Sequence, residues 1–157
     1  MYSLNFTQDC FIRALERLSQ VKEYNSISIS DLCKVSGFSR SSFYRHFQSK
    51  EQLLLHALTQ MFQDCADELQ RRRYGKTSTE YDSFVFAFLR KNKRLLSIVH
   101  LAHLDFALYS FLQSLFQHSS GNANEYQSDL LFAAPAMLII RWIDHNMNES
   151  LLIKSQV

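Results

Sequence analysis

Residues 28–47 have the sequence Ser-Ile-Ser-Asp-Leu-Cys-Lys-Val-Ser-Gly-Phe-Ser-Arg-Ser-Ser-Phe-Tyr-Arg-His-Phe, which is the most informative segment of the chain. Ser28 and Asp31 have the spacing of a capping box, which predicts that a helix begins at Ser28. Gly37 is placed to end that helix, because a residue without Cβ adopts the left-handed backbone at the least cost. Ser39 then caps a second helix. The stretch therefore predicts two short helices joined by a tight turn.

Each short helix is expected to have one apolar face. The first is expected to turn inward Ile29, Leu32, Cys33 and Val35. In the second, Phe43 and Phe47 are i, i+4 partners on one face, and Phe38 lies just before the cap as a staple-like residue. We expect these three rings to pack in a core, although aromatic rings can also stack on bases. Cys33 is expected to be a small buried hydrophobe, with a redox sensor as the alternative.

The segment from Ser39 to Lys50 concentrates positive charge. It carries Arg40, Arg45, His46 and Lys50 and no carboxylate, whereas the formal net charge of the whole chain is only +2. Two short helices crossed over a glycine turn are a common way to present side chains to the major groove of DNA. Arg40, near the start of the second helix, can make a bidentate contact to guanine worth about 1–3 kcal/mol of discrimination. A solvated basic helix face is the alternative interpretation.

Amphipathic patterns on both sides predict further helices. Upstream, Phe11, Ala14, Leu15 and Leu18 recur at i, i+3, i+4 and i+7. Downstream, Ser49 caps a long helix with Gln52 at the capping-box position, and this helix is expected to end near Arg71-Arg72-Arg73. The second half predicts a helix around residues 81–89, a polar break at 91–94, and two helices or one bent helix over 95–117. A loop at 119–124 and a last helix over 125–146, kinked at Pro135, complete the pattern.

The composition supports an all-α chain. Three glycines and one proline in 157 residues leave little material for hairpin turns. The predicted architecture is an N-terminal three-helix helix-turn-helix domain, residues 5–65, joined by a long fourth helix to a C-terminal helical bundle, residues 74–157. The three cysteines have no zinc-site spacing, and the sequence has no run of roughly 20 apolar residues. The first residues lack a basic region followed by an apolar run, so we expect no signal peptide. We expect a soluble cytoplasmic protein without a cofactor.

One known family has the same motifs at the same spacing: Ser28-Ile29-Ser30-Asp31-Leu32-Cys33, Ser36-Gly37-Phe38-Ser39, Phe43-Tyr44-Arg45-His46-Phe47 and Ser49-Lys50-Glu51-Gln52-Leu53-Leu54. Residues 5–63 resemble the N-terminal domain of the TetR family of transcriptional regulators, although the segment after Arg73 is shorter than in most members. The resemblance implies that Tyr44 and Lys50 touch phosphates. It implies that the bases are faced by Ser30, Arg40, Ser41 and Arg45. Ser28, Ser42 and His46 would flank them, and Ser39 completes the expected DNA-binding set.

The second half offers two roles. Small-molecule sites have apolar walls with a few polar tips, and the residues expected to line such an effector pocket are Phe84, Phe88, Leu101, His103, Leu104, Phe106 and Tyr109. The helix over 130–143 is too apolar for a lone surface element, and the resemblance favours it as a dimer element. The residues expected at that interface are Leu131, Ala134, Met137, Leu138, Arg141 and Trp142.

The sequence thus predicts a sequence-specific DNA-binding regulator, a homodimeric repressor of a palindromic operator whose affinity responds to a small apolar effector. The alternative is a TetR-like interaction module or co-regulator that acts through a partner protein. No nucleophile, phosphate-loop or metalloprotease motif is present, which argues against an enzyme. A helical-bundle enzyme would need a metal at His100 and His103, with Asp105 close by, and two histidines without a clear carboxylate partner are weak evidence for one.

Overall fold

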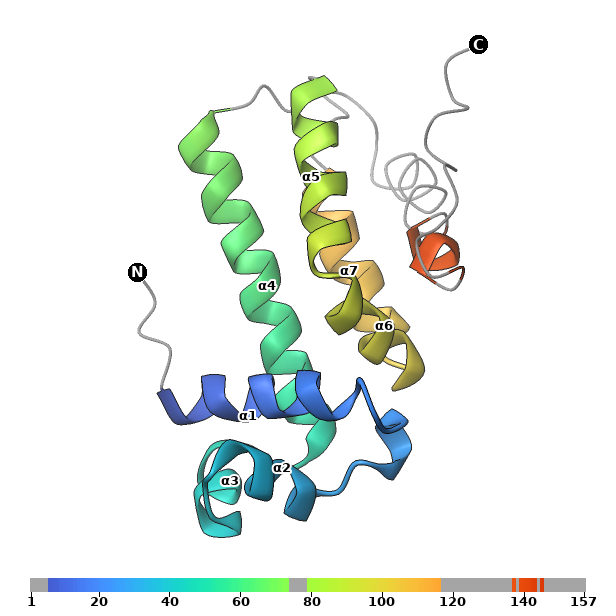
Figure 1. The fold of residues 1–157 in the computed structure, drawn as a ribbon. Helices are drawn as coiled ribbons and strands as arrows, with labels where there is room; N and C mark the ends of the chain where they lie inside the picture. Colours follow the sequence, from blue (N-terminus) through green and yellow to red (C-terminus); the bar gives the residue numbers. More distant parts are fainter. Residues whose placement is uncertain (1–5, 74–78, 117–136, 138, 144, 146–157) are drawn as a thin grey trace. The chain divides into compact units, whose positions relative to one another are not determined.

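The computed structural model of the protein describes residues 6–73, 79–116, 137, 139–143 and 145. Every regular element in these ranges is a helix (Figure 1), which confirms the all-α prediction. The chain divides into two compact units, Met1–Gln60 and Met61–Val157, and the division lies within helix α4 (Lys50–Arg72). Each unit is described by itself.

The first unit contains three short helices and the start of α4. These helices are α1 (Phe6–Leu18), α2 (Ile29–Ser36) and α3 (Arg40–His46), with the 3-10 turn η1 (Tyr24–Ser26) between α1 and α2. Helix α1 packs against both α2 and α3. The core between them is made of fully buried apolar side chains, among them Phe11, Leu15, Leu32, Phe43, Leu53 and Leu54. The predicted helix-turn-helix is therefore formed by α2 and α3 on an α1 support.

The predicted helix ends are confirmed. The Ser28 hydroxyl accepts a hydrogen bond from the Asp31 amide at 3.1 Å, and the Asp31 carboxylate accepts one from the Ser28 amide at 3.0 Å. Gly37 ends α2 in the left-handed conformation, with φ 78°. The Ser39 hydroxyl accepts from the Ser42 amide at 3.1 Å and so caps α3. These caps satisfy backbone groups that a helix terminus leaves unpaired.

One expectation for α2 is wrong. Val35 is 39% exposed, and of the four residues expected to turn inward only Leu32 is fully buried. The reason is the helical period: Ile29, Leu32, Cys33 and Ser36 follow i, i+3, i+4 and i+7, and Val35 falls beside that stripe. Ile29 and Cys33 are half-buried at the edge of the packed face.

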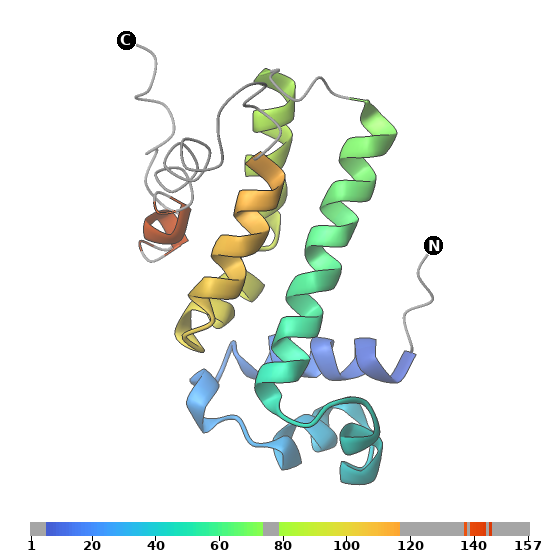
Figure 2. The same cartoon turned by 180° about the vertical axis from the view of Figure 1, so that it is seen from behind.

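The second unit contains the rest of α4 with α5 (Thr79–Lys91), α6 (Lys93–Leu101) and α7 (Asp105–Phe116). The apolar stretch from residue 95 onward therefore forms two helices and not one bent helix. The Tyr81 hydroxyl donates a buried hydrogen bond to the Leu115 carbonyl at 2.6 Å, and α5 and α7 lie side by side (Figures 1 and 2). The rings of Phe62 and Phe111 stack with centroids 4.8 Å apart, which joins α4 to α7.

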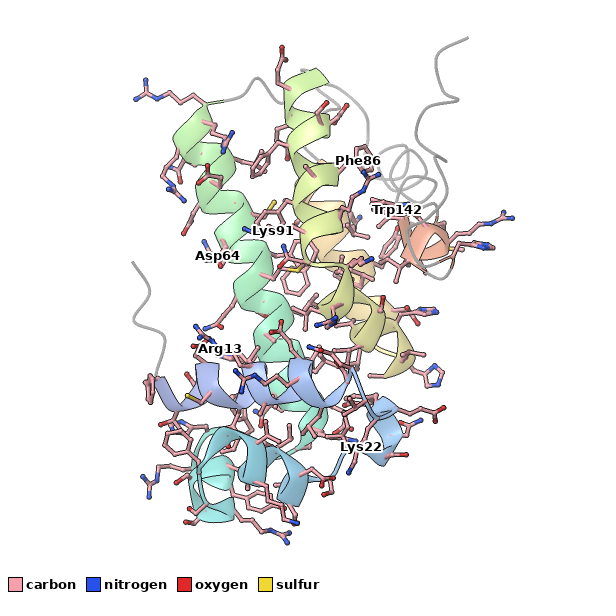
Figure 3. All side chains as sticks on the ribbon, in the orientation of Figure 1. Arg13, Lys22, Asp64, Phe86, Lys91 and Trp142 are labelled. Atoms are coloured by element: carbon pink, nitrogen blue, oxygen red, sulfur yellow. The ribbon has the colours of Figure 1, made fainter. Side chains whose placement is uncertain are left out.

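Further helical residues in this unit are Met137 and 139–143. The Trp142 ring is 1% exposed and meets Phe86 of α5 edge-on, with ring centroids 6.5 Å apart. Both side chains are labelled in Figure 3. The predicted loop at 119–124, Pro135 and most of the last helix lie outside the described residues. Within the described ranges, no helix is long and apolar enough to cross a membrane.

Candidate nucleic-acid interface

Helix α3 presents a polar face to solvent. Arg40, Ser41, Tyr44 and Arg45 are all exposed, with Tyr44 at 50%. In the part of the chain that the structure describes, neither arginine has an ion-pair partner, so both guanidinium groups are available to a ligand. Two planar guanidinium forks and a phenol on one short helix match the donors that contact guanine edges and phosphate oxygens.

The buried face of α3 fixes how this polar face is presented. Phe43 is fully buried, and its ring meets Phe11 of α1 edge-on with centroids 5.2 Å apart. Phe47 packs on Phe43 at 5.7 Å and on Phe11 at 6.5 Å. Phe38, before the cap, lies 5.8 Å from Phe11. Phe43 and Phe47 therefore belong to the core, as expected, whereas Phe38 is half-buried at its edge. This packing turns the arginines outward.

Several serines of the expected DNA-binding set have a role at helix ends. The Ser39 hydroxyl caps α3 and also lies 2.9 Å from the Ser41 hydroxyl and 3.1 Å from the Ser42 hydroxyl. The Ser28 hydroxyl accepts from the Asp31 amide and donates to its carboxylate at 2.8 Å. A phosphate oxygen only accepts, so a serine contacts it by donating its one O–H. The cap of α3 uses the Ser39 oxygen as an acceptor, whereas the O–H of Ser28 already donates to the Asp31 carboxylate. Ser30 is half-exposed on α2.

Lys50 lies in an internal set of contacts. Its ammonium donates to the backbone carbonyls of Tyr24 and Ile27, both at 2.7 Å, and lies 4.3 Å from the centre of the Tyr24 ring. Burial lowers its pKa from the ordinary value. His46, also in the expected set, is half-buried with its ring 6.3 Å from that of Phe47. Sequence reasoning missed the Lys50 contacts, because Tyr24 and Ile27 lie more than twenty residues upstream and no local pattern connects them.

The carboxylates nearest to the interface in sequence have their own partners. Asp31 forms an ion pair with Lys22 at 3.2 Å, and hydrogen bonds from the Ser28 amide and hydroxyl lower its pKa to about 2. Glu51 accepts from the Tyr24 hydroxyl at 3.3 Å. Between these two acids, residues 32–50 hold no carboxylate. The positive charge of α3 is therefore not offset by acids in the same segment.

The formal charge is divided unequally between the two units. Residues 1–60 contain seven lysines and arginines against five carboxylates, and residues 61–157 contain ten of each. The whole excess of +2 therefore lies in the unit that carries α3. A local excess of cations on a helix-turn-helix is the electrostatic signature of nucleic-acid binding.

The residues expected to line an effector pocket are spread over α5, α6, α7 and the turn between the last two. Phe84, Phe88, Leu104 and Tyr109 are half-buried, and Phe84 and Phe88 lie 6.0 Å apart. In contrast, Leu101 is 58% exposed, Phe106 is 83% exposed, and His103 is exposed with a positive φ of 57°. The structure thus places three of the seven residues on the surface: Leu101 at the end of α6, His103 in the turn and Phe106 at the start of α7.

Of the residues expected at a dimer interface, three fall in the described part. Met137 is 63% exposed, Arg141 is exposed and Trp142 is buried. Leu131, Ala134 and Leu138 lie outside the described residues.

The histidines considered for a metal site include His100, whose Nδ1 lies 2.6 Å from the Asp105 carboxylate. Within the described ranges, no three histidine, cysteine or acidic side chains are grouped to hold a metal ion.

Residues 11–57, which include α2, α3 and the Phe11 support, match the model of a family described as "Bacterial regulatory proteins, tetR family". These residues form a tetR-type N-terminal domain. The resemblance inferred from the capping, turn and aromatic motifs is therefore confirmed, and this tetR-type domain is a DNA-binding regulator domain. The match ends within α4, so it concerns the first unit.

The fold of the chain resembles that of the solved structure titled "Dihydroxyacetone kinase operon activator DhaS". The TM-score is 0.66 with 16% sequence identity, and the match covers 89% of this chain and 85% of that chain. At this identity the likeness concerns the fold alone. No curated protein matches the chain in sequence.

Proposed function

We propose that the protein is a homodimeric transcription regulator that binds a palindromic operator and represses the adjacent gene. The observation that carries this proposal is the outward presentation of Arg40, Tyr44 and Arg45 by a helix whose opposite face is held by Phe43. A two-fold dimer of such domains places two recognition helices about 34 Å apart, one turn of duplex DNA. Each helix then contacts one half-site.

Selection of bound duplexes from a random pool at physiological salt tests the proposal. The wild-type protein is expected to enrich an inverted repeat, and Arg40→Ala is expected to lose preference at one position in each half-site. Loss of a good bidentate contact costs about 1–3 kcal/mol, or roughly 5- to 150-fold in affinity. Arg17→Ala is the matched control, because Arg17 is an exposed cation of α1 in the same unit. Enrichment of no sequence by the wild type would contradict the proposal.

We further propose that a small apolar effector binds the second unit near Phe84 and Phe88 and changes operator affinity. The half-buried aromatic side chains of α5 support this location, since apolar ligands bind among aromatic walls. Coupling of this kind needs different effector affinities for the DNA-bound and unbound states, typically worth 1–3 kcal/mol. A compound that raises the melting temperature of the protein but leaves operator affinity unchanged would count against the coupling.

A second function, a module that binds a partner protein, is favoured by one observation. Leu101 and Phe106 expose large apolar surfaces at the α6–α7 turn. Arg40→Ala with Tyr44→Ala distinguishes the two functions, because a regulator that contacts DNA loses its activity in this double variant. A module that acts only through a partner keeps its activity there and loses it in Leu101→Ser with Phe106→Ser.

A further inference from the structure

The contacts of Lys50 connect the two ends of the helix-turn-helix. Its ammonium donates to the carbonyls of Tyr24 and Ile27, which belong to η1 and to the residue directly after it. Ser28, the next residue, is the N-cap of α2. At the other end, α3 stops at His46, and Lys50 is the first residue of α4. One side chain therefore bridges the chain segments that enter and leave residues 28–47.

Glu51 adds a second contact to the same segment. Its carboxylate accepts a hydrogen bond from the Tyr24 hydroxyl at 3.3 Å, while the Lys50 ammonium lies 4.3 Å from the centre of the Tyr24 ring. Tyr24 and Ile27 are 5% and 2% exposed, so η1 is packed against the start of α4. We call the contacts of Lys50 and Glu51 with Tyr24 and Ile27 the α4 clasp.

The clasp limits what the Lys50 ammonium can offer to DNA. An ammonium group has three N–H donors. Two point to carbonyl oxygens at 2.7 Å, and the aromatic face of Tyr24 lies within cation–π distance of the same nitrogen. Burial lowers the pKa of Lys50, as expected for a charged group held away from bulk water. A solvent-exposed lysine that contacts a DNA phosphate has no such internal partners, so Lys50 differs from it.

We propose that Lys50 is a positioning residue of the DNA-binding domain, which closes the helix-turn-helix and holds α2 and α3 in the orientation that DNA requires. This inference rests on the DNA-binding role proposed above, and it replaces the phosphate contact that sequence resemblance implies for Lys50. Closing a loop of about twenty residues by one charged hydrogen-bonded group restricts both ends of the motif at once.

The first test is amide hydrogen exchange on the full chain without DNA. Lys50→Met keeps the aliphatic stem and removes the donors, and Arg17→Met is the matched control for loss of one cation from the same unit. Amides of α2 and α3 are expected to exchange about 10-fold faster in Lys50→Met, with the amides of α1 unchanged, because local opening follows local contacts. No change, or equal acceleration throughout the unit, would overturn the proposal. This arm is independent of whether an operator is found.

The second test is operator binding as a function of salt, well below the melting transition. A lysine on phosphate contributes about 0.9 to the slope of log affinity against log salt concentration. For Lys50→Met we expect operator affinity to fall about 10-fold with the slope unchanged. A slope reduced by about 0.9 would show a phosphate contact and overturn the proposal. Unchanged affinity with only a lower melting temperature would show a merely structural role and also overturn it.

Lys50→Arg gives a readout that does not depend on charge. Arginine keeps the positive charge, so a phosphate contact would survive and affinity would be close to that of the wild type. A guanidinium is wider than an ammonium and cannot take the same place between two carbonyls and a ring. We therefore expect Lys50→Arg to lose operator affinity as well, and a fully active Lys50→Arg would contradict the clasp. This conservative variant also serves if Lys50→Met does not fold.

Discussion

The ring of Phe11 on α1 meets the ring of Phe43 on α3 edge-on, with 5.2 Å between their centres. Both side chains are fully buried. Edge-on aromatic pairs contribute about 0.5–1.5 kcal/mol beyond the area that they bury. The pair fixes the face of α3 that is turned inward, and thereby the face that carries Arg40, Tyr44 and Arg45.

Replacement of Phe43 is therefore expected to unfold the DNA-binding domain at lower denaturant. Phe43→Ala should lower the free energy of unfolding by about 3–5 kcal/mol, the usual cost of a buried phenylalanine, and Phe43→Leu by less. Far-UV circular dichroism during urea unfolding measures the change. Tyr44→Ala is the control, since Tyr44 is half-exposed and its loss should cost less than about 1 kcal/mol. Equal effects at both positions would contradict this assignment of faces.

Gly37→Ala measures the free-energy cost of the left-handed backbone at the turn between α2 and α3. Gly37 has φ 78°, and a Cβ added there meets no atom within 4 Å. The only penalty is the left-handed backbone, which costs a residue with Cβ about 1–2 kcal/mol. We expect a loss of unfolding free energy of that size for Gly37→Ala and a smaller loss for Gly37→Asn, because asparagine adopts this conformation more readily. A stabilising Gly37→Ala would contradict the geometry of the turn.

Asp31 predicts that the unfolding free energy of the first unit decreases at low pH. Hydrogen bonds from the Ser28 amide and hydroxyl lower its pKa from 3.8 to about 2. Since the folded pKa lies below the unfolded one, the contribution to stability is complete above about pH 4 and is lost as the pH falls toward 2. Asp31→Asn should flatten this part of the pH profile of the unfolding free energy. Asp9→Asn, which removes a carboxylate paired with Arg13 on α1, is the control.

His56 predicts a second pH dependence of the unfolding free energy, which arises from burial of a histidine and not from hydrogen bonds to a carboxylate. Its ring packs against Phe47 at 5.6 Å, and its Nε2 atom is buried without a hydrogen-bond partner in the described part of the chain. Burial lowers its pKa from 6.5, so the folded state prefers the neutral ring. Unfolded chains then bind more protons as the pH falls below about 6.5, and stability decreases.

His56→Phe is expected to remove that decrease and to raise the melting temperature at pH 5 more than at pH 8. The substitution also removes a buried polar atom without a partner, which is costly to keep. His103→Gln is the control, because His103 is exposed on the α6–α7 turn. A melting temperature of His56→Phe that follows the wild type across this pH range would show that His56 does not titrate in the core.

Local chemistry explains which parts of the first unit were predictable. Ser28, Gly37 and Ser39 act within three or four residues of themselves, so their spacing predicts where α2 and α3 begin and end. Leu32 was placed correctly and Val35 was not, because an eight-residue helix offers too few turns to define the edge of its buried stripe. Arg40 and its neighbours follow from the same period once Phe43 is known to be inside.

Interactions between distant segments were not predictable. The carbonyls of Tyr24 and Ile27 carry no side-chain signal, so nothing in the sequence connects them with Lys50. In the second unit, hydrophobicity alone does not separate buried from exposed apolar residues. Leu101 and Phe106 fit an apolar pattern and yet lie on the surface at the end of α6 and the start of α7.

The unequal distribution of charge has a kinetic consequence. Because the excess of +2 belongs to residues 1–60 and residues 61–157 are formally balanced, the attraction of duplex DNA acts on the tetR-type domain. Diffusional encounters are thereby biased toward those in which this domain arrives first, which raises the fraction of collisions that lead to binding. The association rate constant for duplex DNA should therefore fall as the ionic strength rises.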